Sequence, residues 1–274
     1  WFDQAMAVVG KPIEWAGDLV MQVPGIDWVM EKAFGGILGL LNDGAAWTVR
    51  PNAIFEEFDG RVAKLEDIQT LDLKQVDRAI GYLAAKYKSL ALVEGAAAGV
   101  AGLPGIPPDV VALLGLNLRA IGEYATYCGF DVNSQQERLF ALNVLGLASS
   151  PTDAAKTVAM AQLVKIAKDV ARKRTWKQLE EHMFVQIVQQ IAKALSIRLT
   201  KAKLAQVVPA AGAAVGGGFN AYFTAKVCDA AYFLYRERFL AEKFGPDVIE
   251  TTVAEAGDGD YGRRSLDRPA FAGA

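Results

Sequence analysis

EGAAAGVAGLPGIPPDVVALLGLNLRAIGEYATYCG, residues 94–129, holds two apolar segments that are separated by a break rich in glycine and proline. Apolar residues recur three and four positions apart on both sides of this break, which is typical of α-helices. The first predicted helix covers residues 73–102, with Asp72 as its N-cap. The second covers residues 109–128 and ends at Gly129, a residue suited to a left-handed helix terminus. The sequence therefore predicts a helical hairpin.

The rest of the chain continues this helical pattern. No segment alternates apolar and polar residues in the manner of a half-buried strand. Further helices are predicted over residues 134–148, 152–173, 176–198, 201–213 and 219–243. A weak internal similarity relates residues 95–129 to residues 207–239, because both combine Ala and Gly with a break and a following helix. The predicted fold is all-α, a bundle of about eight helices in which two Ala/Gly-rich hairpins pack together.

Composition limits the chemistry that this chain can perform. It has 274 residues, 52% of them hydrophobic, with 29 Lys and Arg against 31 Asp and Glu, which excludes a disordered or collagen-like protein. The two cysteines lie in apolar surroundings, which favours a reducing, cytoplasmic compartment over disulfides. The chain has a single histidine, so it lacks most of the residues that zinc sites and catalytic triads commonly use. We expect no metal, no cofactor and no assignable catalytic residue.

Three regions follow from the distribution of apolar residues. Residues 1–61 form an apolar and amphipathic amino-terminal region, residues 62–246 a helical core, and residues 247–274 a flexible tail. The amino-terminal region carries four aromatic residues suited to a membrane interface: Trp15, Trp28, Phe34 and Trp47. Its helix either packs on the core or anchors the protein at an interface, and the sequence leaves both readings open.

Positive charge is concentrated in one part of the chain. Residues 156–203 carry a net charge of +8, which leaves −10 for the remainder. The candidate residues for binding a membrane or another anion are Lys165, Lys168, Arg172, Lys173, Arg174 and Lys177. Such a cationic strip on an amphipathic helix is attracted to anionic lipid, although it is also compatible with a solvated helix face. Nucleic acid is not expected, because the pI is about 5.6 and no aromatic residues interleave the strip.

Residues 204–225 form an uncharged stretch of 22 residues, the length of a membrane span. Its many Ala and Gly residues make it a poor span, because their transfer into lipid is less favourable than that of Leu or Ile. The sequence leaves three readings open: buried hairpins in a bundle, hairpins inserted into a membrane, or one true span.

Several polar residues interrupt the apolar helices. We group them as a candidate internal polar cluster: Glu94, Asp109, Asn117, Arg119, Glu123, Asn220, Lys226 and Asp229. In a functional interpretation they surround a headgroup or act as paired carboxylates. In a structural interpretation Asp109 caps its helix, Arg119 pairs with Glu123, Lys226 pairs with Asp229, and Asn220 is a buried amide that fixes helix register. Glu94 then needs a cation, and Arg119 is its expected partner.

Four of these segments resemble the EcsC protein family: Glu94–Gly99, Gly102–Asp109, Tyr127–Asp131 and Pro209–Asn220. The resemblance extends from about Val62 to Phe244. The family is named for a gene next to a bacterial ABC exporter. The resemblance therefore implies a bacterial helical protein near a membrane, accessory to a transporter or complex, and it assigns no catalytic residue.

These observations favour a non-enzymatic protein that is peripherally associated with the cytoplasmic face of a bacterial membrane. Its expected partners are an anionic membrane surface or a membrane protein complex. A first alternative is a carrier that binds a lipid-like ligand between the two Ala/Gly-rich hairpins. A second is a hydrolase that uses buried carboxylates.

Overall fold

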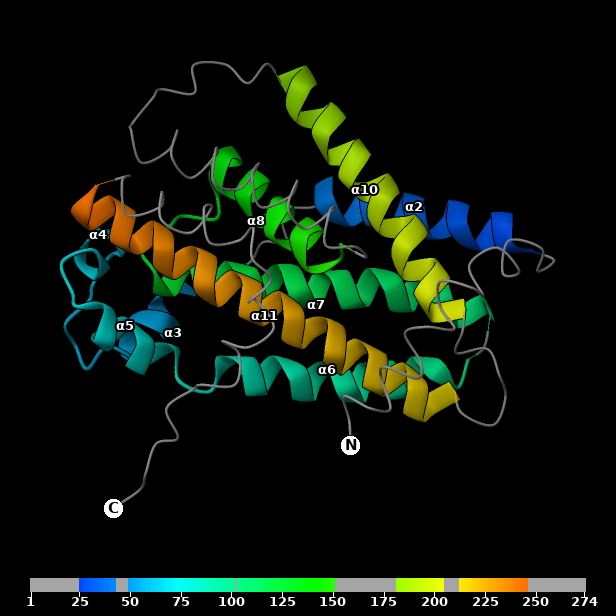
Figure 1. Ribbon diagram of the computed structural model, residues 1–274, viewed down its shortest axis with the longest axis horizontal. Coiled ribbons are helices and arrows are strands. Elements are labelled where there is room, and N and C mark those ends of the chain that lie inside the picture. Colours follow the sequence, from blue (N-terminus) through cyan, green and yellow to red (C-terminus); the bar gives the residue numbers. More distant parts are fainter. Residues whose placement is uncertain (1–24, 43–48, 102, 151–180, 205–211, 246–274) are drawn as a thin grey trace, which may run out of the picture.

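The computed structural model describes residues 25–42, 49–101, 103–150, 181–204 and 212–245, and within these ranges the regular structure is helical with no strand. The helices are α2 (Ile26–Asn42), α3 (Pro51–Glu56), α4 (Leu65–Ile68), α5 (Leu73–Ile80), α6 (Leu83–Gly99), η2 (Leu103–Gly105), α7 (Ile106–Tyr127), α8 (Gln135–Ala148), α10 (Glu181–Leu204) and α11 (Gly212–Phe244). They form one bundle (Figure 1). The predicted all-α class is confirmed.

Helix α7 is the centre of the bundle and contacts α2, α6, α8, α10 and α11 (Figure 1). Pro107 and Pro108 suit its first turn, because proline fixes φ and needs no N–H partner there. The helix ends at Tyr127, and Gly129 follows with a φ of +81°, as the sequence predicted. Nearly every side of α7 is buried, including most of its polar side chains. The elements that surround this helix therefore determine what those polar groups contact.

The helix predicted over residues 73–102 is two helices, α5 and α6. Asp72 is the N-cap of α5, and its backbone N–H donates to Gln75. The break comes at Gly81, whose φ of +46° is strained for any residue with a side chain. Apolar residues keep the helical spacing across this break, so periodicity alone did not reveal it.

The predicted helices at the carboxy-terminal end of the core also differ from the structure. Residues 201–204 continue α10, so they do not open a separate short helix. Helix α11 begins at Gly212, and its three consecutive glycines, residues 216–218, are helical instead of leading into a helix. Glycine weakens an isolated helix by about 1 kcal/mol per residue, but packing against a neighbour outweighs this cost here.

Helix α2 packs on the core. Four of its apolar residues, Val29, Ala33, Ile37 and Leu41, are buried at a spacing of four residues and face α7 and α10. Phe34 is partly buried against the same core, whereas Trp28 is 48% exposed. The structure therefore supports the core-packing reading of this helix.

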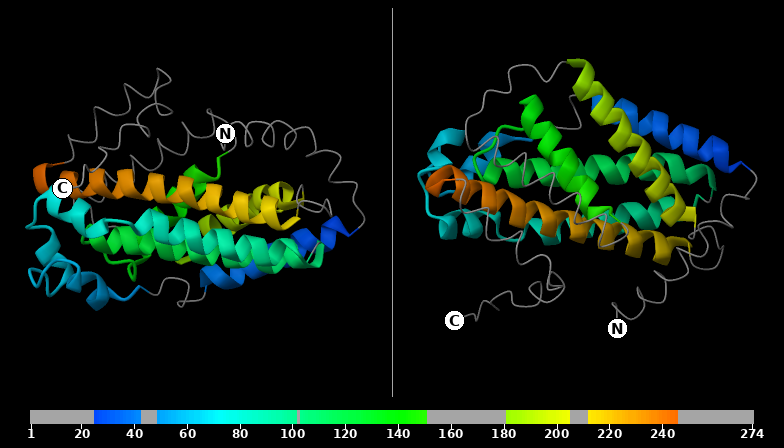
Figure 2. Two further views of the ribbon diagram at one scale, coloured as in Figure 1. Left: turned by 90° about the horizontal axis from the view of Figure 1, so that it is seen from below. Right: turned by 45° about the horizontal axis from the view of Figure 1, so that its top comes forward.

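Helices α6 and α11 pack side by side with their backbones in close contact (Figure 2). A Cβ added at Gly95 would lie 2.5 Å from both the Asn220 side chain and the Gly216 carbonyl oxygen. A Cβ added at Gly217 would lie 2.8 Å from the Leu92 carbonyl oxygen. Gly95, Gly216 and Gly217 therefore allow close contact between α6 and α11, as in other glycine-mediated helix pairs.

We expect Gly95→Ala to lower the free energy of unfolding by about 1–3 kcal/mol, because a methyl group there overpacks the contact with α11. Gly218→Ala is the matched control, since nothing lies within 4 Å of a Cβ at that position on α11. The control should be neutral or stabilising by up to about 1 kcal/mol. Urea unfolding followed by circular dichroism measures both. Equal stabilities of the two variants would contradict the close contact.

Several predictions fall on residues outside the described ranges. They are the helix over residues 152–173, the first five residues of the helix predicted from residue 176, the tail, Trp15, Trp47 and the whole cationic strip from Lys165 to Lys177. Among the helices that are described, none combines the length and the apolar character needed to cross a membrane.

Candidate functional site

A buried polar cluster lies where the C-terminal ends of α6 and α10 meet the N-terminal ends of α7 and α11. Lys203 of α10 donates hydrogen bonds to the side chains of Asp109 and Asn220. Asn220 of α11 in turn donates to Asp109 at 3.1 Å, which closes a ring of three side chains. Lys203 and Asn220 are 0% exposed and Asp109 is 5% exposed. The ring links three helices and is electrically neutral.

The buried surroundings of Lys203 make the neutrality of the ring important for stability. Burial lowers the pKa of its ammonium group, and the Asp109 carboxylate opposes that shift. An isolated charge in such a place is costly, so each member of the ion pair stabilises the other. Lys203 also lies 5.6 Å from the centroid of the Phe219 ring.

Glu94 is the fourth member of this cluster. Both of its carboxyl oxygens are buried and have no hydrogen-bond partner. Burial is the main reason that its pKa rises to about 7; Asp109 raises it further and Lys203 opposes the rise. The expected contact with Arg119 is wrong, because the cation near Glu94 is Lys203.

The structure brings together three of the eight residues that the sequence grouped as a cluster: Glu94, Asp109 and Asn220. Asp109 does not cap α7, which begins three residues earlier, and its carboxylate binds Lys203 instead. Asn220 is the buried amide that the sequence predicted.

The other grouped residues make separate contacts. Asn117 donates to the Leu113 carbonyl oxygen at 2.7 Å and to the Thr224 hydroxyl at 3.1 Å, inside the core. Arg119 lies 3.8 Å from Glu123 as expected, but the nearer partner of Glu123 is Lys86, at 2.9 Å. These contacts hold α7 to its neighbours.

Lys226 and Asp229 lie on the exposed side of α11. The Lys226 ammonium is 4.5 Å from the centroid of the Tyr222 ring. Neither residue belongs to the buried cluster, so placing them in an internal site was wrong.

Lys203 is the member of the site that the sequence analysis missed. In the sequence it falls among the cations of residues 156–203 and in a separate short helix predicted over residues 201–213, whereas in the structure it belongs to α10. The signal was present, because Val188, Ala192, Leu195 and Leu199 form a buried stripe at spacings of three and four, and Lys203 continues that stripe. A lysine on the apolar face of a helix indicates a buried partner.

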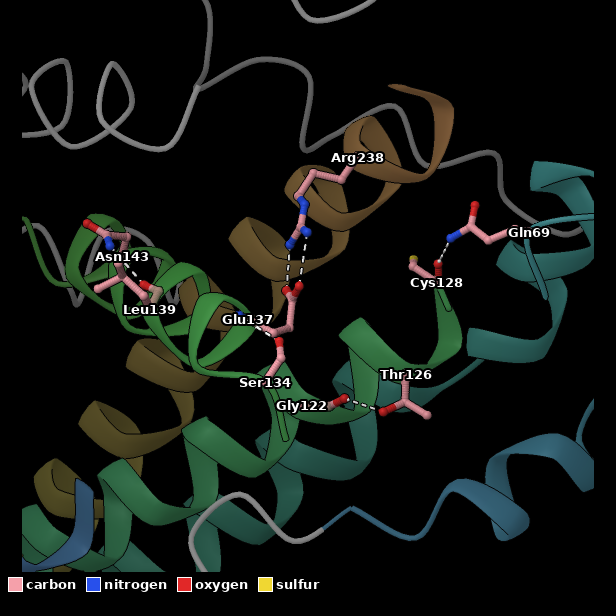
Figure 3. A network of polar contacts seen from close by, with 9 residues as sticks. All are labelled: Gln69, Gly122, Thr126, Cys128, Ser134, Glu137, Leu139, Asn143 and Arg238. Atoms are coloured by element: carbon pink, nitrogen blue, oxygen red, sulfur yellow. Dashed lines mark hydrogen bonds and ion pairs between the residues drawn. The ribbon is translucent and has the colours of Figure 1, made fainter. Parts of the chain in front are cut away.

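A second buried ion pair holds α8 to α11 (Figure 3). Arg238 donates to both carboxylate oxygens of Glu137, and both side chains are almost fully buried. The guanidinium carbon lies 4.0 Å and 4.2 Å from the ring centroids of Phe130 and Phe140. This two-bond geometry between aromatic rings is a structural clamp, because each charged atom already has a partner in the protein.

Comparison with known proteins places this fold in a family. The chain is 27% identical over 193 residues to the uncharacterized protein YdbA of Bacillus subtilis (strain 168), covering 70% of this chain and 66% of that protein. It is 26% identical over 182 residues to the protein EcsC of the same organism, covering 66% of this chain and 70% of that protein. No solved structure matches the chain. The EcsC protein family matches residues 25–240, a range that runs from α2 into α11 and includes all four members of the buried cluster. The chain belongs to the EcsC protein family.

Proposed function

We propose that this protein is a non-enzymatic helical protein that associates peripherally with the inner face of a bacterial membrane, and that α6 is the element that touches the lipid. One observation carries the proposal. Helix α6 carries several exposed apolar residues on one face, and an apolar patch of this kind often marks an interaction site. The α6 face, as we call it, comprises three exposed residues of the helix and the two that directly follow it: Leu90, Val93, Ala97, Val100 and Ala101.

The geometry of the α6 face suits a lipid surface. Leu90, Val93 and Val100 are 48%, 69% and 79% exposed, and their spacing of three and seven residues puts them on one side of the helix. Helix α6 lies at the lower edge of the bundle in Figure 1, with α7 above it and α11 crossing in front. An apolar stripe on an outer helix can enter the headgroup region without any change in the fold.

The charges beside the α6 face have the sign that anionic lipid requires. Lys86 lies one turn before Leu90, and its side chain is 53% exposed. Arg119 of α7 is 51% exposed and shares Glu123 with Lys86, so two cations surround one carboxylate. Each cation held near an anionic surface contributes about 1 kcal/mol to binding. The cationic strip between Lys165 and Lys177 would add to this attraction.

The buried contacts give less support to the two alternatives. Gly95 lies directly against Asn220 and Gly216, so the crossing of α6 and α11 has no room for an acyl chain. Asp109 is held by Lys203 and Asn220, and the carboxyl oxygens of Glu94 are buried. A substrate would have to displace packed side chains to reach either carboxyl group.

Flotation with vesicles of phosphatidylglycerol and phosphatidylcholine tests the proposal. Val93→Asp and Leu90→Asp should each lower the binding constant by about 10- to 100-fold, because a buried Val or Leu side chain contributes about 1.5–3 kcal/mol. High salt should weaken the binding of the wild-type protein, because it screens the cations from the anionic lipid.

Phe244→Asp is the matched control, because Phe244 is 68% exposed at the far end of α11. It should float like the wild type. Unchanged flotation of both α6 variants at low and high salt would reject α6 as the lipid contact. An absence of wild-type flotation under either condition would reject membrane binding itself.

A further inference from the structure

The buried cluster contains two carboxyl groups, Glu94 and Asp109, but only one positively charged group, Lys203. Lys203 and Asp109 form a neutral pair, and Asn220 completes their hydrogen bonds. Glu94 lies beside this pair, and neither of its oxygens receives a hydrogen bond. If Glu94 is ionised, the cluster carries a net charge of −1 in the interior of the bundle.

Three helices pack around Glu94, and only one of them brings a positive charge. Helix α7 presents the Asp109 carboxylate, α10 presents the Lys203 ammonium, and α11 presents the uncharged Asn220. Lys203 is the only favourable charge that acts on Glu94 among the described residues, and it already binds Asp109. A proton on Glu94 removes the excess charge.

Water cannot easily solvate the Glu94 carboxylate once the proton is lost. Gly95, the next residue along α6, lies so close to α11 that a single added carbon would be 2.5 Å from the Gly216 carbonyl oxygen. The carboxyl oxygens of Glu94 are themselves buried, although the residue as a whole is partly exposed, so hydrating them requires the end of α6 to move away from its neighbours. An unpaired buried carboxylate is unfavourable, and a local opening that exposes it to water relieves this penalty.

We propose that Glu94 is a proton-operated latch: its neutral form keeps the C-terminal half of α6 docked on α11, and loss of the proton releases that half. The latch acts in the protein in solution and does not depend on membrane binding.

The direction of the pH dependence follows from linkage. The pKa of Glu94 is about 7 when the helix is docked, against 4.5 for a solvated glutamate. Between these values the docked form holds a proton that the open form has lost, so docking weakens as the pH rises through this window and is weakest above about pH 7. From pH 6 to pH 8 the opening equilibrium should shift about tenfold toward the open form.

Amide hydrogen exchange measures this opening, after correction for the intrinsic exchange rate at each pH. Protection of residues 90–99 should fall about tenfold between pH 6 and pH 8 in the wild-type protein. Glu94→Gln, which cannot ionise, should keep its protection at both values. The control Glu66→Gln changes an exposed residue of α4 and should retain the wild-type pH dependence.

Two results would overturn the proposal. One is equal protection of α6 at pH 6 and pH 8 in the wild type, and the other is a Glu94→Gln protein that retains the full pH dependence. Carbon-13 NMR of the glutamate carboxyl groups provides a test that needs no stable variant: the Glu94 signal should titrate near pH 7, and a midpoint below pH 5 would reject the latch.

Discussion

Lys203→Met is expected to lower the free energy of unfolding by about 3–5 kcal/mol, because it leaves the buried Asp109 carboxylate without its cation. Methionine matches much of the volume of lysine, so the loss measures charge and hydrogen bonding more than a cavity. The midpoint of urea unfolding, followed by circular dichroism, measures it. The same substitution also removes a hydrogen bond to Asn220 and so loosens α11.

The double variant Lys203→Met with Asp109→Leu separates charge from packing. Replacing both members of a buried ion pair by apolar residues is often close to neutral. Part of the stability lost in the single variant should therefore return, although Asn220 then lacks both of its partners in the ring. A double variant as unstable as Lys203→Met would show that the pair is not the source of the loss.

Arg238→Ala should have a similarly large effect, about 3–5 kcal/mol, because Glu137 would remain buried and unpaired. Arg238→Lys keeps the charge but loses the second hydrogen bond and the planar contact with Phe130 and Phe140. We expect an intermediate loss for the lysine variant. Urea unfolding again provides the measurement.

Arg236→Ala is a control on the same helix. Its partner Asp77 lies 2.8 Å away, but the two side chains remain 24% and 28% exposed. Ion pairs with access to water contribute about 0–1 kcal/mol. If Arg236→Ala destabilised the protein as much as Arg238→Ala, burial would not be what distinguishes the two pairs.

The candidate site was only partly predictable from the sequence. Asn220 was identified as buried because Phe223 and Val227 share its face, a local property of α11. Glu94 was recognised as a carboxylate that needs a cation, but the wrong cation was chosen. Lys203 is 94 residues from Asp109 in the chain, and no local pattern connects them.

Helix boundaries were likewise predictable where the signal is local and were missed where it is not. Asp72 and Gly129 were correctly predicted as boundary residues, because the signals at helix ends act over only a few residues. The break at Gly81 and the helical glycines 216–218 were missed. At residues 216–218 packing against a neighbouring helix outweighs the low helix propensity of glycine, whereas at Gly81 the regular spacing of apolar residues hid a break that glycine permits.

By itself the sequence determined the all-α class, most of the helices, the family and the Ala/Gly-rich segments that allow helices to pack closely, because all of these depend on spacing and residue type along the chain. The tertiary structure alone decided that Lys203 joins Asp109 and Asn220, that Glu94 remains unpaired beside them, and that one face of α6 is exposed. Such features depend on which helix ends meet in space, and buried charges are stable only in particular combinations.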